Sequence, residues 1–437
     1  MNTNGNVALP TRQMTSIKFK NLLINFTTEF HSITSTQTSA SNPGNFWRPA
    51  PAPDVLPGFF PLGDVIASED GELNGKRVVA VVCEGDLQSG DSAQTKALSP
   101  PDDYEQLWRD SNSKQGGAMW RPIAPDGYIA LGVVCSRGDE KPPLHAVRCV
   151  RADLVISSRV GNSIWNNWDS GAEESFSAYQ VEPPVPAAGE IYFAPGTFIG
   201  FKKDSQSSIL VEAFSLRMEI PLKINPAPTP PVLSGFESPS SLEPSQATQI
   251  ATIPWFAVKD IALRPIDQFR TSPYYYLNRT DHYVLIGHSH NTGDEESAFK
   301  WTAGRVLVSN VLQIFIRETS IQVQTEWTSG TSDAGQPVNF SAKLSESFIH
   351  NETSSSGWSN SKTETVEAIV PPNKMVAVYQ LQSHYDLLRE DGTEAAVNFS
   401  YADRGRFHFT EYPPGGNAPL VAPQPPTDST AITDTAP

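Results

Sequence analysis

The chain has 437 residues, of which 38% are hydrophobic and 18% charged, and its formal net charge at pH 7 is −16. This length is too great for one ordinary hydrophobic core and predicts two domains. The net negative charge does not provide the basic surface that nucleic-acid binding needs. No apolar run approaches the ~20 residues of a membrane-spanning helix. We therefore expect a protein that is soluble as made and has no nucleic-acid partner.

Turn-forming residues dominate the sequence pattern. Pro (37) and Gly (29) are abundant, and Ser and Thr separate short runs of Val, Ile, Phe and Tyr. Such a mixture is typical of many short strands joined by turns. The sequence thus predicts an all-β fold.

Residues 1–40 form an N-terminal extension, in which 17–30 (IKFKNLLINFTTEF) predict one or two strands. Residues 1–13 are polar and lack the apolar core of a signal peptide. We therefore expect the protein to be made in the cytoplasm, and to reach target membranes after release by a non-conventional route or by lysis.

An internal repeat follows the extension. Residues 46–49 (FWRP) and 119–122 (MWRP) each precede a stretch with the pattern Gly-aromatic-x-x-Leu-Gly-x-Val, at 58–65 and 127–134, and a weaker echo lies at 192–201. Each unit offers a turn, a short strand and a second glycine, and its Trp is interpreted as a core anchor. Repeated strand units of this kind stack about a pseudo-symmetry axis, as in a prism, or pair in a sandwich.

The repeats resemble the family named for vacuolar protein sorting-associated protein sixty-two, as do the downstream stretches 150–155 (VRADLV), 163–166 (SIWN) and 169–172 (DSGA). The resemblance covers about 41–225. Its one departure is the extra residues 52–56 in the first repeat, which affect a loop. The family implies an all-β domain without established chemistry, and its similarity to targeting modules of toxins implies receptor binding.

Composition divides the remainder of the chain. The Pro/Ser-rich residues 226–250 predict a linker, and 251–412 predict a second domain. The tail 413–437 has Pro, Thr, Ala and Asp without periodicity, so we expect it to be disordered.

An amphipathic hairpin is expected within the second domain. Residues 338–345 (VNFSAKLS) alternate apolar and polar, a Ser/Asn-rich connection spans 350–361, and 362–370 (KTETVEAIV) form a more polar second strand. The length suits a barrel strand, which crosses a bilayer in ~9–11 residues. The candidate membrane-insertion residues are Val338, Phe340, Ala342, Leu344, Phe348, Ile349, Trp358, Thr363, Thr365 and Val366.

The hairpin, together with 371–380, 272–277 (SPYYYL) and 391–392, resembles the pore-forming region of aerolysin-type toxins. The resemblance is diffuse and has no invariant motif. It implies an elongated β domain whose hairpin is covered in the monomer and then builds a barrel shared between subunits, because closure satisfies every strand edge in lipid. Ordinary sandwich strands alternate in the same way, so an interior strand is the alternative interpretation.

Three histidines recur at even spacing, His282, His288 and His290, and would share one face of a continuous strand. Gly287 and a turn at 291–293 interrupt that strand, and no metal-ligand motif is formed. The histidines are interpreted as surface or turn residues, with a pH-sensing cluster as the alternative.

Four aromatic residues are candidates for receptor binding: Trp165, Trp168, Tyr274 and Tyr275. Aromatic rings stack on sugars or lie at membrane interfaces, although core packing is the commoner role.

Catalytic motifs are missing from the sequence: it has no phosphate-binding loop, nucleophile elbow, zinc-binding helix motif or Cys/His pairing. We therefore expect neither an enzyme nor a cofactor or metal. Cys83, Cys135 and Cys149 lack redox or ligand spacing and are interpreted as small buried hydrophobic residues, with one disulfide as the alternative.

These patterns lead to two functional hypotheses. The first is a β-pore-forming toxin-like protein, insecticidal or defensive, that binds a glycan or protein receptor on a target cell, forms a homo-oligomer and inserts its hairpin into the membrane. The second is a non-lytic lectin-like protein or trafficking adaptor.

Overall fold

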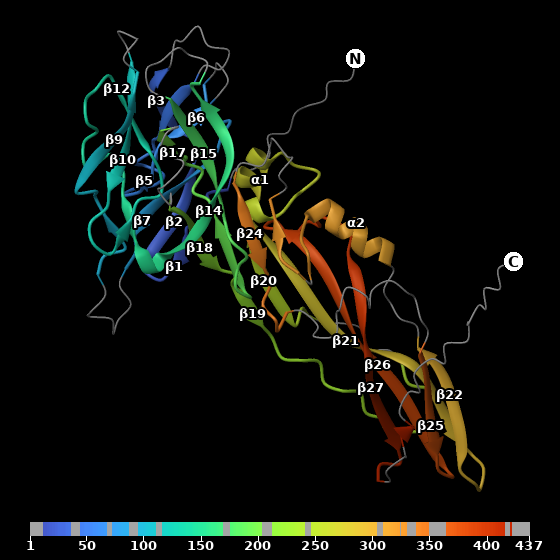
Figure 1. The fold of residues 1–437 in the computed structure, drawn as a ribbon. Helices are drawn as coiled ribbons and strands as arrows, with labels where there is room; N and C mark the ends of the chain where they lie inside the picture. The colour runs from blue at the N-terminus through green and yellow to red at the C-terminus, as the bar shows by residue number, and fades with distance from the viewer. Residues whose placement is uncertain are drawn as a thin grey trace, which may run out of the picture.

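The computed structural model describes residues 12–35, 44–67, 72–86, 95–110, 116–168, 175–202, 212–240, 246–303, 309–323, 325–329, 338–348, 364–415 and 420–421. These residues are organised almost entirely as antiparallel sheets, which confirms the all-β prediction. Figure 1 shows an elongated molecule, with a broad β body formed by the first half and a long, narrow sheet extending from it.

Three three-stranded units with the same strand order form the body, and the third of them is one end of a seven-stranded sheet. Each has a central strand flanked by the strand before it and the strand after the repeat's turn. The sheets are β3 (Phe30–Ser35), β4 (Asn45–Pro49) and β6 (Val65–Ala67); β9 (Asp103–Arg109), β10 (Gly117–Ile123) and β12 (Val134–Arg137); and β14 (Val155–Asn166), β15 (Phe176–Glu182) and β17 (Ile199–Lys202).

Pairing registers show that the sheets are equivalent. Trp47 lies opposite Val65 in the first sheet, and Trp120 lies opposite Val134 in the second. In the third sheet Tyr179 lies opposite Ile199, so Tyr179 stands where the other repeats have their Trp. The arrangement is three-sheeted and prism-like, which is one of the two arrangements that the repeat predicts.

The second glycines of the repeats meet at the centre of the prism. A Cβ on Gly63 would lie 2.8 Å from Cα of Gly132, and a Cβ on Gly132 would lie 2.7 Å from Oγ1 of Thr197, so only a residue without a side chain fits at the first two positions. Thr197 is therefore the third counterpart.

Further short strands close the end of the prism that faces the second half. They are β1 (Ile17–Phe19), β2 (Leu22–Thr27), β7 (Val79–Glu84) and β5 (Phe60–Pro61); β11 (Tyr128–Ile129), β13 (Cys149–Arg151) and β8 (Leu98–Ser99), with the 3-10 turn η1 (Ala152–Leu154); and β18 (Ala213–Glu219) and β16 (Glu190–Phe193).

The two halves of the chain share one hydrophobic core. β24 (Phe340–Lys343) from the second half pairs with β16 on one side and with β23 (Trp327–Thr328) on the other, so it extends a sheet of the first half. Phe26 and Phe193 from the first half pack with Trp255 and Phe256 of the turn η3 (Trp255–Ala257).

A five-stranded antiparallel sheet forms the narrow extension. Its order is β19 (Leu222–Ile224), β20 (Gln249–Pro254), β21 (Tyr274–Asn291), β26 (Lys374–Arg389) and β27 (Phe399–Tyr412). The Pro-rich segment before β20 lies along one face of this sheet, with Leu233 packed on Met375, Ala377 and Tyr379. At the far end lies a second sheet of β22 (Ser297–Ala303), β25 (Glu364–Val370) and β28 (Leu420–Val421) (Figure 1).

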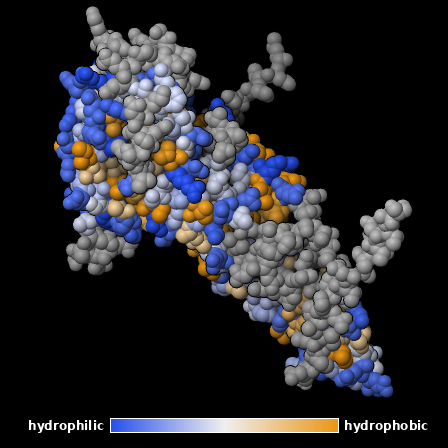
Figure 2. All heavy atoms as spheres, viewed as in Figure 1, coloured by the Kyte–Doolittle hydropathy of each residue, from blue (hydrophilic) through white to orange (hydrophobic). Residues whose placement is uncertain are grey.

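Two α-helices occur among the described residues, α1 (Pro265–Thr271) and α2 (Ser309–Thr319). Both pack on the shared core near the start of the long sheet. On the face drawn in Figure 2, hydrophilic residues dominate the coloured surface of the body, and apolar residues gather in small groups between them.

Candidate functional site

The first strand of the expected hairpin is an interior strand. Val338, Phe340, Ala342 and Leu344 are at most 3% exposed and belong to the shared core, as does Phe348. β24 pairs with β16 and β23, whereas the second expected strand lies in β25 and pairs with β22. The prediction that these two segments pair with each other is therefore wrong in this structure.

Hydrogen bonding explains why the polar face of this strand is not a solvent face. Ser341 is 2% exposed within the sheet, and Asn339 donates through Nδ2 to Oε1 of Gln180 and to the carbonyl oxygen of Val181, at 3.2 Å each. A polar side chain can be buried when its hydrogen bonds are made inside the protein, and alternation cannot reveal such partners.

The remaining insertion candidates divide into two groups. Ile349, Trp358 and Thr363 lie outside the described residues. Thr365 and Val366 lie on β25, where Thr365 is exposed and Val366 is buried. The amphipathic ribbon of the second half is therefore the β22–β25 pair.

Each face of the β22–β25 ribbon has its own character. Phe299, Trp301, Val366 and Ala368 are among the side chains that pack on the long sheet, against Ile286, Val376, Val378, Phe407 and Phe409. The outer face carries Lys300 and Glu367, whose charged groups lie 3.2 Å apart, together with Thr302 and Thr365. This apolar cluster is separate from the shared core, so the ribbon covers an apolar surface of the long sheet that the core does not include.

The ribbon is the folded-back continuation of the two central strands of the long sheet. β21 leads through residues 292–296 into β22, and β25 leads through 371–373 into β26. At the fold, Asn291 pairs with Lys374 and Ser297 pairs with Val370. Five residues separate the pairs on one strand and three on the other, so straightening both turns would align the two ladders with a two-residue bulge.

Gly287 allows the ribbon to lie flat on the sheet. A Cβ at this position would lie 2.0 Å from Cδ1 and 2.7 Å from Cγ of Trp301, closer than any real contact. The indole therefore lies directly on the backbone of β21. Gly287 also follows an irregularity in the pairing with β26, between Leu285 and Gly287.

Asn291 fastens both turns of the fold. Its Nδ2 donates to the carbonyl oxygen of Glu295 at 2.7 Å and to that of Val370 at 2.8 Å, and the residue is 4% exposed. In the other turn Asn373 has φ +56°, a left-handed conformation that Asn tolerates better than most residues. The two turns are thus held by local hydrogen bonding and turn geometry.

Helix α2 follows the ribbon strand β22 and is docked on the body. Phe315 is fully buried, with its ring 5.0 Å from that of Phe399 on β27. At the helix end, the carbonyl oxygen of Thr319 accepts from the N–H of Lys259. The ribbon is therefore tethered at this end to a helix that belongs to the shared core.

The receptor-binding candidates lie apart from one another. Trp165 is 2% exposed in the prism core, where its ring packs edge-on against Phe46, and Tyr275 is fully buried. Neither ring is accessible to a receptor in this fold. Trp168 is 48% exposed, and Tyr274 is partly buried with its hydroxyl donating to the carbonyl oxygen of Thr15.

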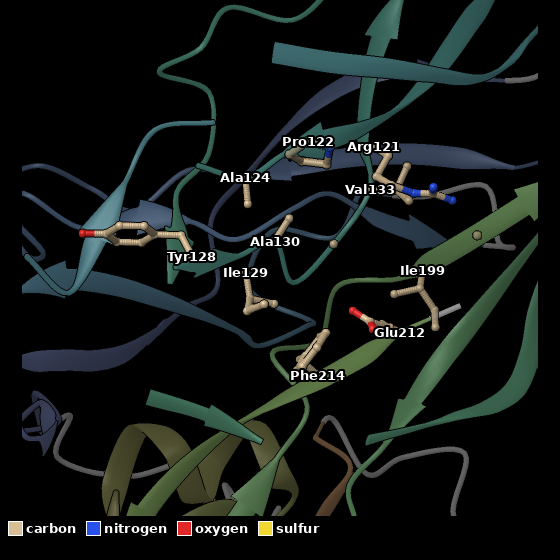
Figure 3. Close-up of a pocket in the computed structure, with 12 residues that line it drawn as sticks. Arg121, Pro122, Ala124, Tyr128, Ile129, Ala130, Val133, Ile199, Glu212 and Phe214 are labelled. Atoms are coloured by element: carbon tan, nitrogen blue, oxygen red, sulfur yellow. The ribbon is translucent and has the colours of Figure 1, made fainter. Parts of the chain in front are cut away.

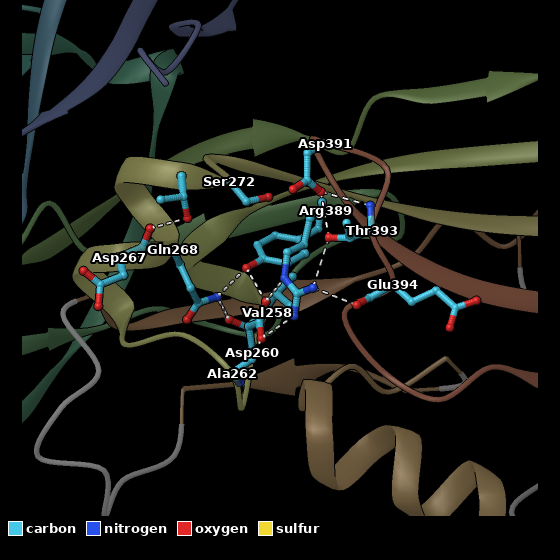
Figure 4. Close-up of polar contacts among 12 residues, drawn as sticks. Val258, Asp260, Ala262, Asp267, Gln268, Ser272, Arg389, Asp391, Thr393 and Glu394 are labelled. Carbon is cyan, nitrogen blue, oxygen red and sulfur yellow. Dashed lines mark hydrogen bonds and ion pairs between the residues drawn. The ribbon is translucent and has the colours of Figure 1, made fainter. Parts of the chain in front are cut away.

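Tyr275 belongs to a buried polar network at the start of the long sheet (Figure 4). Its hydroxyl donates to Asp260, which also accepts two hydrogen bonds from Arg389, at 2.7 and 3.0 Å. Burial raises the pKa of Tyr275, and hydrogen bonding to Asp260 raises that of Arg389. The charges of Asp260 and Arg389 offset each other, so the network does not resemble a reactive centre. It connects Tyr275 on β21 to Arg389 on β26.

The three histidines do not share one face. The pairing irregularity after Leu285 reverses the alternation of β21, so His282 faces the ribbon side of the sheet. His290 lies on the other side, where its ring stacks 4.4 Å from that of Phe236, and His288 shares that side. Among the described residues, no group of three His, Cys, Asp or Glu side chains could hold a metal ion.

Residues 11–228 match the family Vps62, described as vacuolar protein sorting-associated protein 62. Among curated proteins, none matches the chain. Cry35Ab1 is similar over 91% of both chains, with 11% identity and a TM-score of 0.34. GNIP1Aa from Chromobacterium piscinae is similar over 41% of this chain but only 33% of its own, with 25% identity and a TM-score of 0.32. In the described part of the chain, no helix is long and apolar enough to cross a membrane.

Proposed function

The first half of this chain, residues 11–228, belongs to the Vps62 family, and we propose that it is the binding half of a pore-forming protein. In this proposal the first half attaches the protein to a target-cell surface. The second half then assembles with other copies and inserts a β ribbon into the membrane. No step requires an enzyme activity.

The observation that carries the proposal is the folded-back ribbon. β22 and β25 continue the strands β21 and β26, which are hydrogen-bonded to each other in nearly the same register. Straightening the two turns therefore lengthens an existing two-stranded ladder and does not require a new one. The extended strands would run from 274 to 303 and from 364 to 389, well beyond the ~9–11 residues that span a bilayer.

The two faces of the ribbon suit this transition. In the soluble form Phe299, Trp301 and Val366 are covered by the long sheet. In a barrel shared between subunits these side chains would face lipid, and the Lys300–Glu367 face would line the water-filled interior. Barrel closure would satisfy the backbone groups at the ribbon edges, which a single inserted ribbon could not do.

Distance requires that helix α2 move as well. The ribbon strands have seven residues each, and reversing their direction would move the Ala303 end by ~45 Å at ~3.3 Å per residue. The five residues 304–308 can reach ~20 Å. The segment that joins the two ribbon ends also contains β23 and β24. The transition therefore includes the release of α2 from its site beside Phe399 and of β24 from its pairing with β16.

A reversible disulfide tests the proposal. Gly287→Cys and Trp301→Cys would place Cβ of residue 287 ~3 Å from the sulfur of residue 301, as in a disulfide. In a Cys83→Ser background, we expect the oxidised double variant to release no dye from liposomes or target cells that the reduced form permeabilises. The single Trp301→Cys variant, insensitive to oxidation, is the control.

Two results would contradict the proposal. Equal leakage from the oxidised and reduced double variant would show that the ribbon does not move. Sealed membranes with every form of the protein, including the unmodified chain on susceptible cells, would favour a non-lytic binding protein.

A further inference from the structure

A cleft of about 280 Å³ lies between the second and third repeats of the prism (Figure 3). Arg121, Tyr128 and Val133 line it from the second repeat, and Ile199, Glu212 and Phe214 line it from the other side. Figure 3 shows the Glu212 carboxylate turned toward Ile129 and Phe214. The cleft thus combines apolar walls with one positive and one negative side chain.

At the junction between the first and second repeats, the position that corresponds to the cleft is filled by an arginine–aspartate ion pair. There Arg48 donates through Nε and Nη2 to both carboxylate oxygens of Asp64, at 2.9 Å each. Arg48 also donates to the carbonyl oxygen of Cys135, and Asp64 accepts from the Cys135 N–H. The carboxylate is completely buried between the repeats.

The second repeat keeps the arginine and lacks the acid. Arg121 follows Trp120 as Arg48 follows Trp47, but Val133 stands in the position of Asp64. Gly200 is the counterpart of Cys135 and also lines the cleft. Arg121 instead meets Glu105 at 3.2 Å, with the two side chains 40% and 55% exposed. Such an exposed pair contributes little stability, so Arg121 can exchange Glu105 for another carboxylate.

We propose that the cleft binds the carboxylate of an acidic sugar at the end of a glycan. Arg121 donates to the sugar carboxylate in the way that Arg48 donates to Asp64. Glu212 accepts hydrogen bonds from ring or side-chain hydroxyls, and the C–H faces of the sugar pack on Ile129 and Phe214. The inference rests on the proposed function, because it names what the binding half would recognise on a cell.

Charge favours a sugar over a peptide or a polyanion. An acidic peptide would bring further carboxylates toward Glu212, whereas sugar hydroxyls offer the donors that this group needs. The net charge of −16 also repels highly sulfated chains over a longer range. A single carboxylate among hydroxyls satisfies both charged groups of the cleft.

A glycan array tests the inference without any membrane step. The full-length protein is applied to matched glycans that differ only in a terminal sialic acid, a terminal glucuronic acid or its neutral counterpart, with sulfated glycans and acidic peptides on the same slide. We expect retention on one or both carboxylated members, which also distinguishes the two sources of the carboxylate. Arg121→Gln should weaken this retention at least ~10-fold, as expected for a lost charge-assisted hydrogen-bonding pair.

Val133→Asp provides a sharper variant. It recreates the Arg48–Asp64 arrangement inside the second repeat, so the internal carboxylate should occupy Arg121 and abolish glycan retention. Thermal melting shows whether the variant is folded, and Arg121→Gln carries the test if it is not. Arg109→Gln, which alters another exposed arginine of the same sheet, should bind normally.

Several outcomes would overturn the inference: preference for the neutral glycans, retention on sulfated glycans or acidic peptides alone, or full binding by Arg121→Gln. The array measures binding without membrane insertion. A protein that releases dye but is not retained on carboxylated glycans would therefore contradict the glycan site and not the proposed pore formation. Carboxylate-dependent binding without dye release would support the glycan site and contradict pore formation.

Discussion

Burial controls the reactivity of the three cysteine side chains. The three cysteines are unpaired, with Cys135 and Cys149 buried and Cys83 partly exposed. Burial raises the pKa of Cys149 to about 12 and that of Cys135 well above its ordinary value, and it also raises that of Cys83. A thiol reacts as its thiolate, so a raised pKa leaves less reactive thiol at any pH below it.

We therefore expect one reactive thiol in the native protein. At pH 8 a thiol-specific chromogenic reagent should modify Cys83 slowly and should leave Cys135 and Cys149 unmodified until the chain is unfolded in guanidinium, when all three react. Cys83→Ser should remove the native signal. Rapid modification of two thiols in the folded protein, or fewer than three after unfolding, would contradict the burial or the unpaired state.

At the scale of elements, the turns of the folded-back ribbon set its stability. Asn291 donates to carbonyl oxygens in both connections, those of Glu295 and Val370. Removing such a buried donor leaves the acceptors unsatisfied, at a cost of ~1–3 kcal/mol. In the proposed function this cost falls on the soluble form alone, because straightening the turns breaks the same contacts.

Asn291→Ala should therefore release the ribbon more readily. We expect faster dye release from liposomes at equal protein concentration, and faster hydrogen exchange in β22 and β25 than in the unmodified protein. Asn278→Ala is the matched control, since Asn278 lies on the same strand but bonds to Asp386 away from the turns. Unchanged exchange in the ribbon would show that Asn291 does not fasten it, and slower dye release would contradict the role assigned to the turns.

Local sequence patterns predicted many of the strands and turns in the first half. The Trp-Arg-Pro repeats identified two of the three prism sheets, because identical turns and anchors give identical local structure. The third sheet was harder to detect, since Tyr179 and Thr197 replace the Trp and the second Gly. Its equivalence depends on pairing partners distant in sequence, which no local motif encodes.

The candidate site was predictable only in part. β25 was expected, but its partner was not β24: the stretch Phe299-Lys300-Trp301-Thr302 has the same alternation and would have identified β22. Alternation shows that a strand has two faces and does not show which strand it pairs with. The register continuity between the ribbon and the long sheet appears only when both pairings are known.

The whole molecule behaves as one unit because β24 crosses from the second half to the first. Phe340 lies opposite Phe193 in that sheet, and its ring is 6.2 Å from that of Phe256. Most of the large buried side chains at the junction belong to this shared core. The ribbon cluster lies outside it, so the molecule combines a rigid body with a separately covered tip.

This division predicts different responses to two core truncations. Phe340→Ala removes a 3% exposed ring from the shared core and should cost ~3–5 kcal/mol. We expect both halves to lose stability together, seen as one unfolding transition and as equal increases in hydrogen exchange in β4 and β26. Val366→Ala, in the ribbon cluster, should increase exchange in β22 and β25 and leave the prism unchanged. Separate melting of the halves in Phe340→Ala would mean that β24 does not couple them, and that binding by the prism could not be transmitted through this core to the ribbon.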